Sequence, residues 1–263
     1  MPFSRAFRLV PVILILSLAA CLPRATNLMQ EAESLYLKNQ YRESVRVFLQ
    51  IVDRYPGSPE AETALLRVGQ TFMLNLSDPQ NALEYFGRLV GEYPRGPKAV
   101  QAHELMASIY EKELRNYDEA VAQYRMLLDS NMGRDPGKYI LAIGRCFYLK
   151  EEYKTAIMEY RKIVDKYPDS NWAQEAEYQI ANCYFVWNKC DDAVKQYNRV
   201  LETYAQTKYK NDIMLSIGVC MEDKEDYTQA LKIYRDLEDK YENKLLIKKR
   251  IDAVMVRMRN KHR

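Results

Sequence analysis

The protein has 263 residues, of which 48% are hydrophobic and 29% are charged, and its formal net charge at pH 7 is +3. Its positive charge lies at the ends: residues 1–20 hold two arginines and no acid, and residues 244–263 hold eight Lys or Arg and one acid. The intervening body is mildly acidic, which argues against a nucleic-acid binder, whose basic residues would cover the domain itself.

The first twenty residues have the pattern of a secretory signal peptide. Arg5 and Arg8 precede an uninterrupted apolar run at residues 9–16, and small residues follow at positions 19 and 20. A membrane-spanning helix needs about 20 apolar residues. This run is too short, so we expect residues 1–20 to be a removable signal and not a mature anchor.

Residues 18–21, Leu-Ala-Ala-Cys, resemble a bacterial lipobox. The resemblance implies cleavage before Cys21, acylation of its thiol and new amino group, and a short lipidated linker at residues 21–24. Leu22, standing where inner-membrane lipoproteins have Asp, implies sorting to the periplasmic face of the outer membrane. Each buried methylene of an acyl chain contributes about 0.8 kcal/mol, so more than one chain makes anchoring stable. An ordinary signal with an incidental cysteine is the alternative.

Between residues 25 and 243 the sequence repeats with a period of 36–38 residues. Each repeat has a small residue, an aromatic residue four positions later and an aliphatic residue three positions further on. The small residues are Ser44, Ala82, Ala120, Ala156, Ala193 and Ala230; the aromatic residues are Phe48, Phe86, Tyr124, Tyr160, Tyr197 and Tyr234. These positions share one face of a helix, so the pattern predicts a buried stripe in the second helix of six repeats.

A second signature lies about twelve residues before each small residue. It is a Gly or Ala followed three positions later by a large residue, as at Gly69, Gly144, Ala181 and Gly218. The small residue predicts the point where a first helix packs closely on the second. Repeats two and three are one residue longer between these points, and we expect the extra residue in the turn.

Three of the predicted second helices end in Tyr-Pro, at residues 55–56, 93–94 and 167–168. Proline cannot continue a helix and disfavours helical geometry in the residue before it. These features resemble the tetratricopeptide repeat (TPR). The resemblance implies an all-α, right-handed superhelical solenoid of about six helical hairpins over residues 25–243. Apolar residues spaced along residues 244–263 predict a basic capping helix and tail.

Three cysteines, Cys146, Cys183 and Cys220, recur every 37 residues at one repeat position. Stacked helices lie about 8–10 Å apart, too far for a disulfide, and the spacing supplies no metal-ligand cluster. We expect them to be small core residues. Cys190 stands where other repeats have Tyr, and a disulfide with Cys183 is left open.

A catalytic interpretation finds little support. His103 and His262 are the only histidines, and the sequence has no nucleophile–base set, phosphate-binding loop or metal motif. The sequence therefore predicts a protein that is not an enzyme, with no cofactor, no metal and no small-molecule substrate.

The TPR resemblance implies that first-helix residues line a concave groove. The candidate groove residues are Leu66, Met73, Leu141, Arg145, Tyr148, Tyr178, Asn182 and Phe185. An apolar and aromatic groove with a few polar positions suits an extended or helical peptide. The alternative is that these side chains pack against neighbouring helices or the chain's own terminus.

A lipobox followed by such repeats resembles three kinds of bacterial envelope protein. The closest resemblance is to the BamD/YfiO-type lipoprotein of the β-barrel assembly complex; the Tol-Pal coordinator and the type IV pilus secretin pilotin are less close. The resemblance implies a lipid-anchored, periplasm-facing scaffold that binds envelope proteins or peptide segments, most directly in outer-membrane protein assembly. A regulator of peptidoglycan enzymes is a further alternative.

Overall fold

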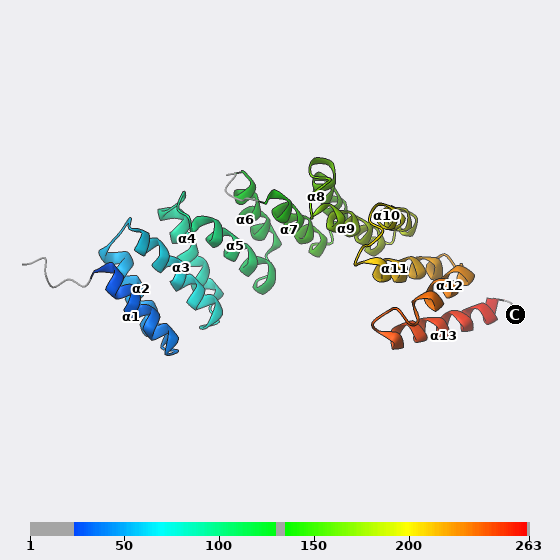
Figure 1. Ribbon diagram of the computed structural model, residues 1–263, viewed down its shortest axis with the longest axis horizontal. Helices are drawn as coiled ribbons and strands as arrows, with labels where there is room; N and C mark the ends of the chain where they lie inside the picture. The colour runs from blue at the N-terminus through cyan, green and yellow to red at the C-terminus, as the bar shows by residue number, and fades with distance from the viewer. Residues whose placement is uncertain (1–23, 130–134, 262–263) are drawn as a thin grey trace, which may run out of the picture. The chain divides into compact units, whose positions relative to one another are not determined.

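The computed structural model describes residues 24–129 and 135–261 (Figure 1). Within these ranges the chain forms helices and no strand. The predicted signal peptide, the predicted lipidation site Cys21 and His262 lie outside the described residues. The chain divides into two compact units, residues 1–99 and residues 100–263, and each is considered by itself.

The described helices form six hairpins and one final helix. They are α1 (Ala25–Leu37) with α2 (Tyr41–Arg54), α3 (Pro59–Leu74) with α4 (Pro79–Glu92), α5 (Ala99–Ser108) and its continuation η1 (Ile109–Glu113) with α6 (Tyr117–Asp129), α7 (Pro136–Leu149) with α8 (Tyr153–Lys166), α9 (Ala173–Val186) with α10 (Cys190–Thr203), α11 (Lys210–Asp223) with α12 (Tyr227–Leu237), and α13 (Lys244–Lys261). Within each unit, helices consecutive in the chain pack on one another. The predicted all-α solenoid with a C-terminal capping helix is confirmed.

Local sequence sets the ends of the helices. Ser58 accepts a hydrogen bond from the Ala61 amide, and Pro59 occupies the first helical position of α3, where its missing N–H costs nothing. The helices α2, α4 and α8 each end one residue before the tyrosine of a Tyr-Pro pair. The predicted stop signals are therefore confirmed.

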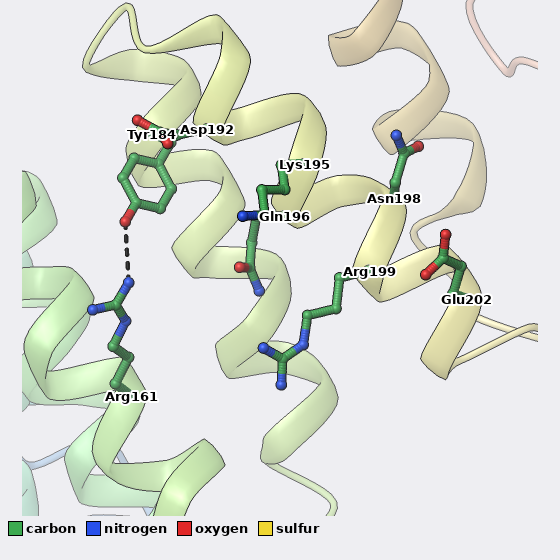
Figure 2. A pocket seen from close by; sticks show the side chains of 8 residues that line it. All are labelled: Arg161, Tyr184, Asp192, Lys195, Gln196, Asn198, Arg199 and Glu202. Atoms are coloured by element: carbon green, nitrogen blue, oxygen red, sulfur yellow. Dashed lines mark hydrogen bonds between the residues drawn. The ribbon is translucent and has the colours of Figure 1, made fainter.

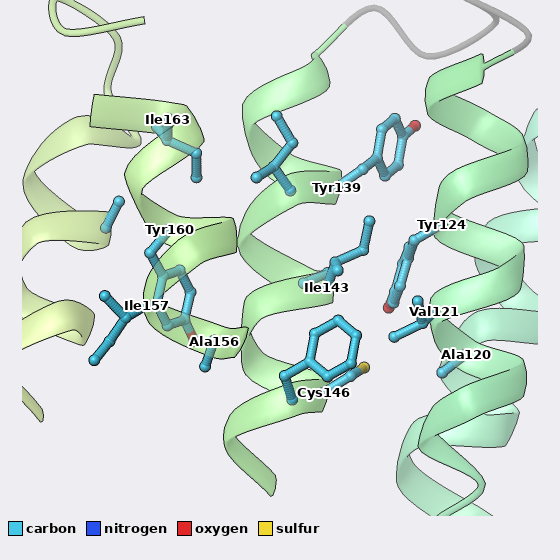
Figure 3. Close-up of a cluster of buried hydrophobic side chains, with 14 of the residues drawn as sticks. Ala120, Val121, Tyr124, Tyr139, Ile143, Cys146, Ala156, Ile157, Tyr160 and Ile163 are labelled. Atoms are coloured by element: carbon cyan, nitrogen blue, oxygen red, sulfur yellow. The ribbon is translucent and has the colours of Figure 1, made fainter. Parts of the chain in front are cut away.

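The predicted stripe forms the core of every hairpin. All six small residues are 0% exposed, and the aromatic residues four positions later are 0–8% exposed. Figure 3 shows this packing around α6, α7 and α8. At Gly69, Gly144 and Gly218 an added Cβ would lie 2.4–2.5 Å from a ring carbon of the same repeat's aromatic residue. The ring therefore rests directly on the backbone of the first helix.

The extra residue of repeats two and three is accommodated in two different ways. Most hairpin turns span three residues with a positive φ at the second, such as Glu151 at 62°. Repeat two has a four-residue turn at residues 75–78, as predicted. Repeat three keeps a three-residue turn, so the prediction of a longer turn there was wrong. Its extra residue is absorbed by η1, a π-helical turn, which inserts one residue without breaking the helix.

The final helix α13 covers the last hairpin with Ile247, Ile251 and Val254. It also supplies charge. The carboxylate of Glu222 on α11 is 1% exposed and pairs with Arg250 at 3.2 Å and Arg257 at 3.0 Å. A buried carboxylate needs such partners because an unpaired buried charge is costly.

Substituting arginine at the centre of the stripe tests the repeat register. Ala156→Arg buries a long cation in a contact with no room for it, and should destabilise the protein by on the order of 3–5 kcal/mol. Met158, on the same helix, is 58% exposed, and Met158→Arg should change stability by less than about 0.5 kcal/mol. Thermal denaturation followed by circular dichroism compares the two; equal melting temperatures would contradict the register.

Candidate functional site

The predicted groove residues differ in their exposure. Leu66 is only 4% exposed and packs in the core of residues 1–99, so it offers little accessible surface. Met73 is partly exposed on α3. The remaining six predicted residues lie on α7 and α9, within residues 100–263.

Three of those six line one pocket. The pocket has a volume of about 250 Å³ and lies among α7, α8 and α9. Its lining residues are Leu141, Arg145, Tyr148, Leu149, Tyr160, Glu175 and Gln179. The wall is largely aliphatic and aromatic, and the polar groups are a guanidinium, two phenols, a carboxylate and an amide. An apolar cavity with a few polar groups is the usual form of a binding site.

The guanidinium of Arg145 is held in place by a buried carboxylate on η1. Its Nε donates to Oε1 of Glu111 at 2.6 Å and its Nη2 donates to Oε2 at 2.9 Å. Glu111 is 6% exposed and also accepts a hydrogen bond from Tyr124 at 3.1 Å. The hydrogen bonds that Arg145 donates to Glu111 raise the pKa of the Arg145 guanidinium above its ordinary value. Arg145 is thus a fixed, paired cation and not a free one.

Tyr160 also lines the pocket and is 2% exposed. Burial raises the pKa of its hydroxyl, and the nearby Glu175 adds to the effect while Arg145 opposes it. The group is therefore a protonated hydrogen-bond donor at any physiological pH. Its hydroxyl has no hydrogen-bond partner among the residues that the structure describes.

The other three predicted residues, on α9, are engaged in packing. Tyr178 stacks on Tyr209 with the ring centroids 4.1 Å apart. The Oδ1 atom of Asn182 accepts from Tyr197 at 2.6 Å, and its Nδ2 donates to Gln179 at 3.2 Å. Phe185 packs against the cluster of α9–α13. The structure does not bring these three into the pocket.

Four lining residues were not predicted from the sequence: Leu149, Tyr160, Glu175 and Gln179. Tyr160 was assigned to the buried stripe, which is correct for its ring. The sequence does indicate that the Tyr160 hydroxyl lacks an acceptor on its own first helix. The positions of α7 that match the acceptor positions in other repeats hold Arg145 and Tyr148, and neither carries a carboxylate or an amide.

A second depression, of about 620 Å³, lies over α8, α9 and α10 (Figure 2). Its charges are mixed. Arg161 donates to the Tyr184 hydroxyl at 3.1 Å, and Arg199 pairs with the buried Glu177 at 3.2 Å. Its remaining charged side chains, Asp192, Lys195 and Glu202, carry both signs. No single charge dominates, so this surface defines no ligand class.

The cysteines behave as the repeat predicts. Cys146, Cys183 and Cys220 are 0% exposed, and all four described cysteines are free thiols. Burial raises the pKa of Cys183 to about 12. Burial and the neighbouring thiol of Cys190 raise the pKa of Cys220. Cys190 therefore faces Cys220 of the next hairpin and belongs to a different core cluster from Cys183.

Oxidation should reveal this pairing. Cys190 is the partly exposed thiol of the pair, so diamide should oxidise it first, and Cys220 then closes the disulfide as the pair gives up two protons and two electrons. Peptide mass mapping should find a Cys190–Cys220 link, absent in Cys190→Ser and retained in Cys146→Ser. A Cys183–Cys190 link would contradict the assignment.

The described ranges contain no group of three or more His, Cys, Asp or Glu side chains arranged to hold a metal ion. No helix in them has the length and apolarity needed to span a lipid bilayer.

The helical hairpins, the small-residue and aromatic stripe and the pocket on first-helix residues define a TPR scaffold for protein–protein interaction. TPR profiles match residues 175–207 and 212–243. The YfiO profile, described as outer membrane lipoprotein, matches residues 23–183. The chain belongs to the YfiO family of outer membrane lipoproteins. TPR scaffolds of this kind are typically not enzymes.

Other known proteins are similar to the chain at low sequence identity. It is 25% identical over 148 residues to the human alpha-soluble NSF attachment protein, a match that covers 55% of this chain and 47% of that protein. The chain thus spans about half the length of the curated relatives it matches. The type IV pilus biogenesis factor PilW is similar with a TM-score of 0.54 and 14% identity, over 88% of this chain and 98% of PilW. YrrB, a TPR protein with an unusual peptide-binding site, has a TM-score of 0.52 and 18% identity, over 76% of this chain and 95% of YrrB. At these identities the similarity concerns the fold.

Proposed function

We propose that this protein is a lipid-anchored, periplasm-facing adaptor of an envelope machine, and that the machine assembles outer-membrane proteins. The observation that carries the proposal is the family match, which starts at residue 23, two residues after the lipobox cysteine. A signal peptide, a lipid acceptor and a protein-binding scaffold in this order make a membrane-tethered binding surface. We further propose that it has no catalytic activity and no cofactor.

The pocket of α7–α9 supports a binding role. It combines an apolar wall with a guanidinium that Glu111 holds in a fixed position. Binding groups that are fixed before the partner arrives lose less conformational entropy when it binds. From the predicted groove, this proposal keeps Leu141, Arg145 and Tyr148 as contact residues. It treats Tyr178, Asn182 and Phe185 as their structural support, and leaves Met73 as a separate surface position.

Lipid anchoring is tested at the cysteine. Cys21→Ser removes the only thiol of the lipobox, so the chain should lose the mass of the acyl groups and move from the membrane fraction to the soluble fraction. Intact mass and membrane fractionation measure this, and Cys146→Ser serves as the control that retains the anchor. An acylated, membrane-bound Cys21→Ser protein would refute the anchor.

The machine is tested by crosslinking the full chain in intact cells and identifying the recovered proteins by mass spectrometry. We expect components that assemble outer-membrane proteins. Recovery of Tol-Pal components, of a pilus secretin or of peptidoglycan enzymes in their place would replace the proposed machine with the corresponding alternative.

A further inference from the structure

Four of the six stripe positions carry tyrosine, and each of these rings is buried. Three of the four hydroxyls donate to an acceptor on the first helix of the same repeat. The pairs are Tyr124 with Glu111 at 3.1 Å, Tyr197 with Asn182 at 2.6 Å, and Tyr234 with Glu222. The chain thus supplies an acceptor wherever the stripe ends in a phenol, with one exception.

The exception is Tyr160. Its ring is as deeply buried as the others and rests on Gly144, but its hydroxyl has no partner among the described residues. The oxygen is not sealed from solvent, since Ser170 Oγ alone among the described side-chain oxygens and nitrogens is fully buried without a partner. Tyr160 lines the pocket, so water or the acceptor of a ligand reaches the hydroxyl from that side.

A second donor belongs to the same pocket. Arg145 donates from Nε and Nη2 to Glu111. Its Nη1 has no hydrogen-bond partner among the described residues. The carboxylate in the lining, Glu175, already accepts from Tyr209 and from Gln179. Apart from the hydroxyl of Tyr148, which can donate or accept, the lining groups without a partner among the described residues are therefore two donors, and the ligand must bring an acceptor.

The charges and the apolar wall of the pocket further restrict the class of ligand that it can bind. Arg145 is neutralised by Glu111, so an anionic ligand would gain little from it and would meet Glu175. A cationic ligand would meet Arg145 itself. Leu141, Tyr148 and Leu149 form an apolar surface beside the two donors. The volume of about 250 Å³ lies just below the range for drug-sized ligands, which suits a single amino-acid residue.

We propose that this pocket binds one uncharged residue of an extended partner segment. The residue's main-chain carbonyl accepts hydrogen bonds from Tyr160 and Arg145, and its aliphatic side chain lies against Leu141, Tyr148 and Leu149. This inference rests on the proposed role as a protein-binding adaptor and specifies the chemistry of its partner.

The hydroxyl is tested by removing it alone, in the full chain purified as the cell processes it. Tyr160→Phe deletes an unpaired donor, so its melting temperature should equal or exceed that of the unsubstituted protein. Tyr234→Phe is the matched control: it deletes a hydroxyl of the same stripe that bonds Glu222, and should lower the melting temperature. A lowered melting temperature in Tyr160→Phe, like that of the control, would show that the hydroxyl is already paired and overturn the proposal.

The ligand is tested with blocked tripeptides in ligand-observed NMR titrations. Acetyl-Ala-Leu-Ala-amide should bind measurably and acetyl-Ala-Gly-Ala-amide at least about tenfold more weakly, since it lacks the apolar side chain. Tyr160→Phe should weaken binding of the leucine peptide by about fivefold, the effect of one neutral hydrogen bond, and Tyr234→Phe should leave it unchanged. Leu149→Ala, at a position 43% exposed, should weaken binding without loss of folding.

Each contrary outcome is decisive. No binding of the leucine peptide, equal binding of the glycine peptide, or equal binding by Tyr160→Phe and the unsubstituted protein would overturn the subsite. Tighter binding of the same peptide with a free carboxylate would overturn the assignment of an uncharged ligand. The adaptor role is measured separately, because crosslinking can still recover envelope partners when the tripeptides do not bind. Only the loss of both crosslinked partners and tripeptide binding would contradict the two proposals together.

Discussion

The contact between an aromatic ring on the second helix and a small residue on the first sets the geometry of each hairpin. At Gly144 the ring of Tyr160 occupies the place that a side chain would take, so the two helices approach as closely as their backbones allow. Close approach brings the rest of the stripe into contact and excludes water from it. It also brings the hydroxyls of Tyr124, Tyr197 and Tyr234 to acceptors on the first helix of their own repeats.

That position of the hydroxyls accounts for the unusual buried charges. Glu111 and Glu222 are nearly inaccessible, yet both accept a tyrosine hydroxyl, and both pair with arginine from the helix that follows their own hairpin, α7 for Glu111 and α13 for Glu222. Buried ion pairs add little net stability, but removing one partner is strongly unfavourable. Their effect is therefore to fix which residues face one another between repeats. The ion pair with Glu111 fixes the orientation of Arg145, and Arg145 in turn supplies the pocket with a fixed hydrogen-bond donor.

The repeat could be predicted from the sequence because its determinants are local. A small residue at Ala156 and an aromatic residue at Tyr160 share a helix, so their spacing alone reports their common face. The stripe, the six hairpins and the final helix all follow from spacing of this kind.

The groove was harder to predict because it depends on residues from other repeats. Tyr178 has the helix position of a groove residue, but the ring of Tyr209, 31 positions later in the chain, stacks on it. Asn182 also has the helix position of a groove residue, but the hydroxyl of Tyr197 donates a hydrogen bond to its side-chain oxygen. The π-helical turn at residues 109–113 was also missed, because spacing counts the extra residue and does not say which segment absorbs it.

The arrangement around Glu222 makes the folding of the last hairpin depend on the end of the chain. Both guanidiniums that neutralise this carboxylate come from α13, as do the aliphatic side chains that cover the hairpin. A polypeptide that stopped after α12 would present an uncompensated buried charge and an uncovered apolar face, and its last repeat would open readily. Opened segments are the substrates of cellular proteases, so a copy that ended after α12 would be degraded more readily than one that carries α13.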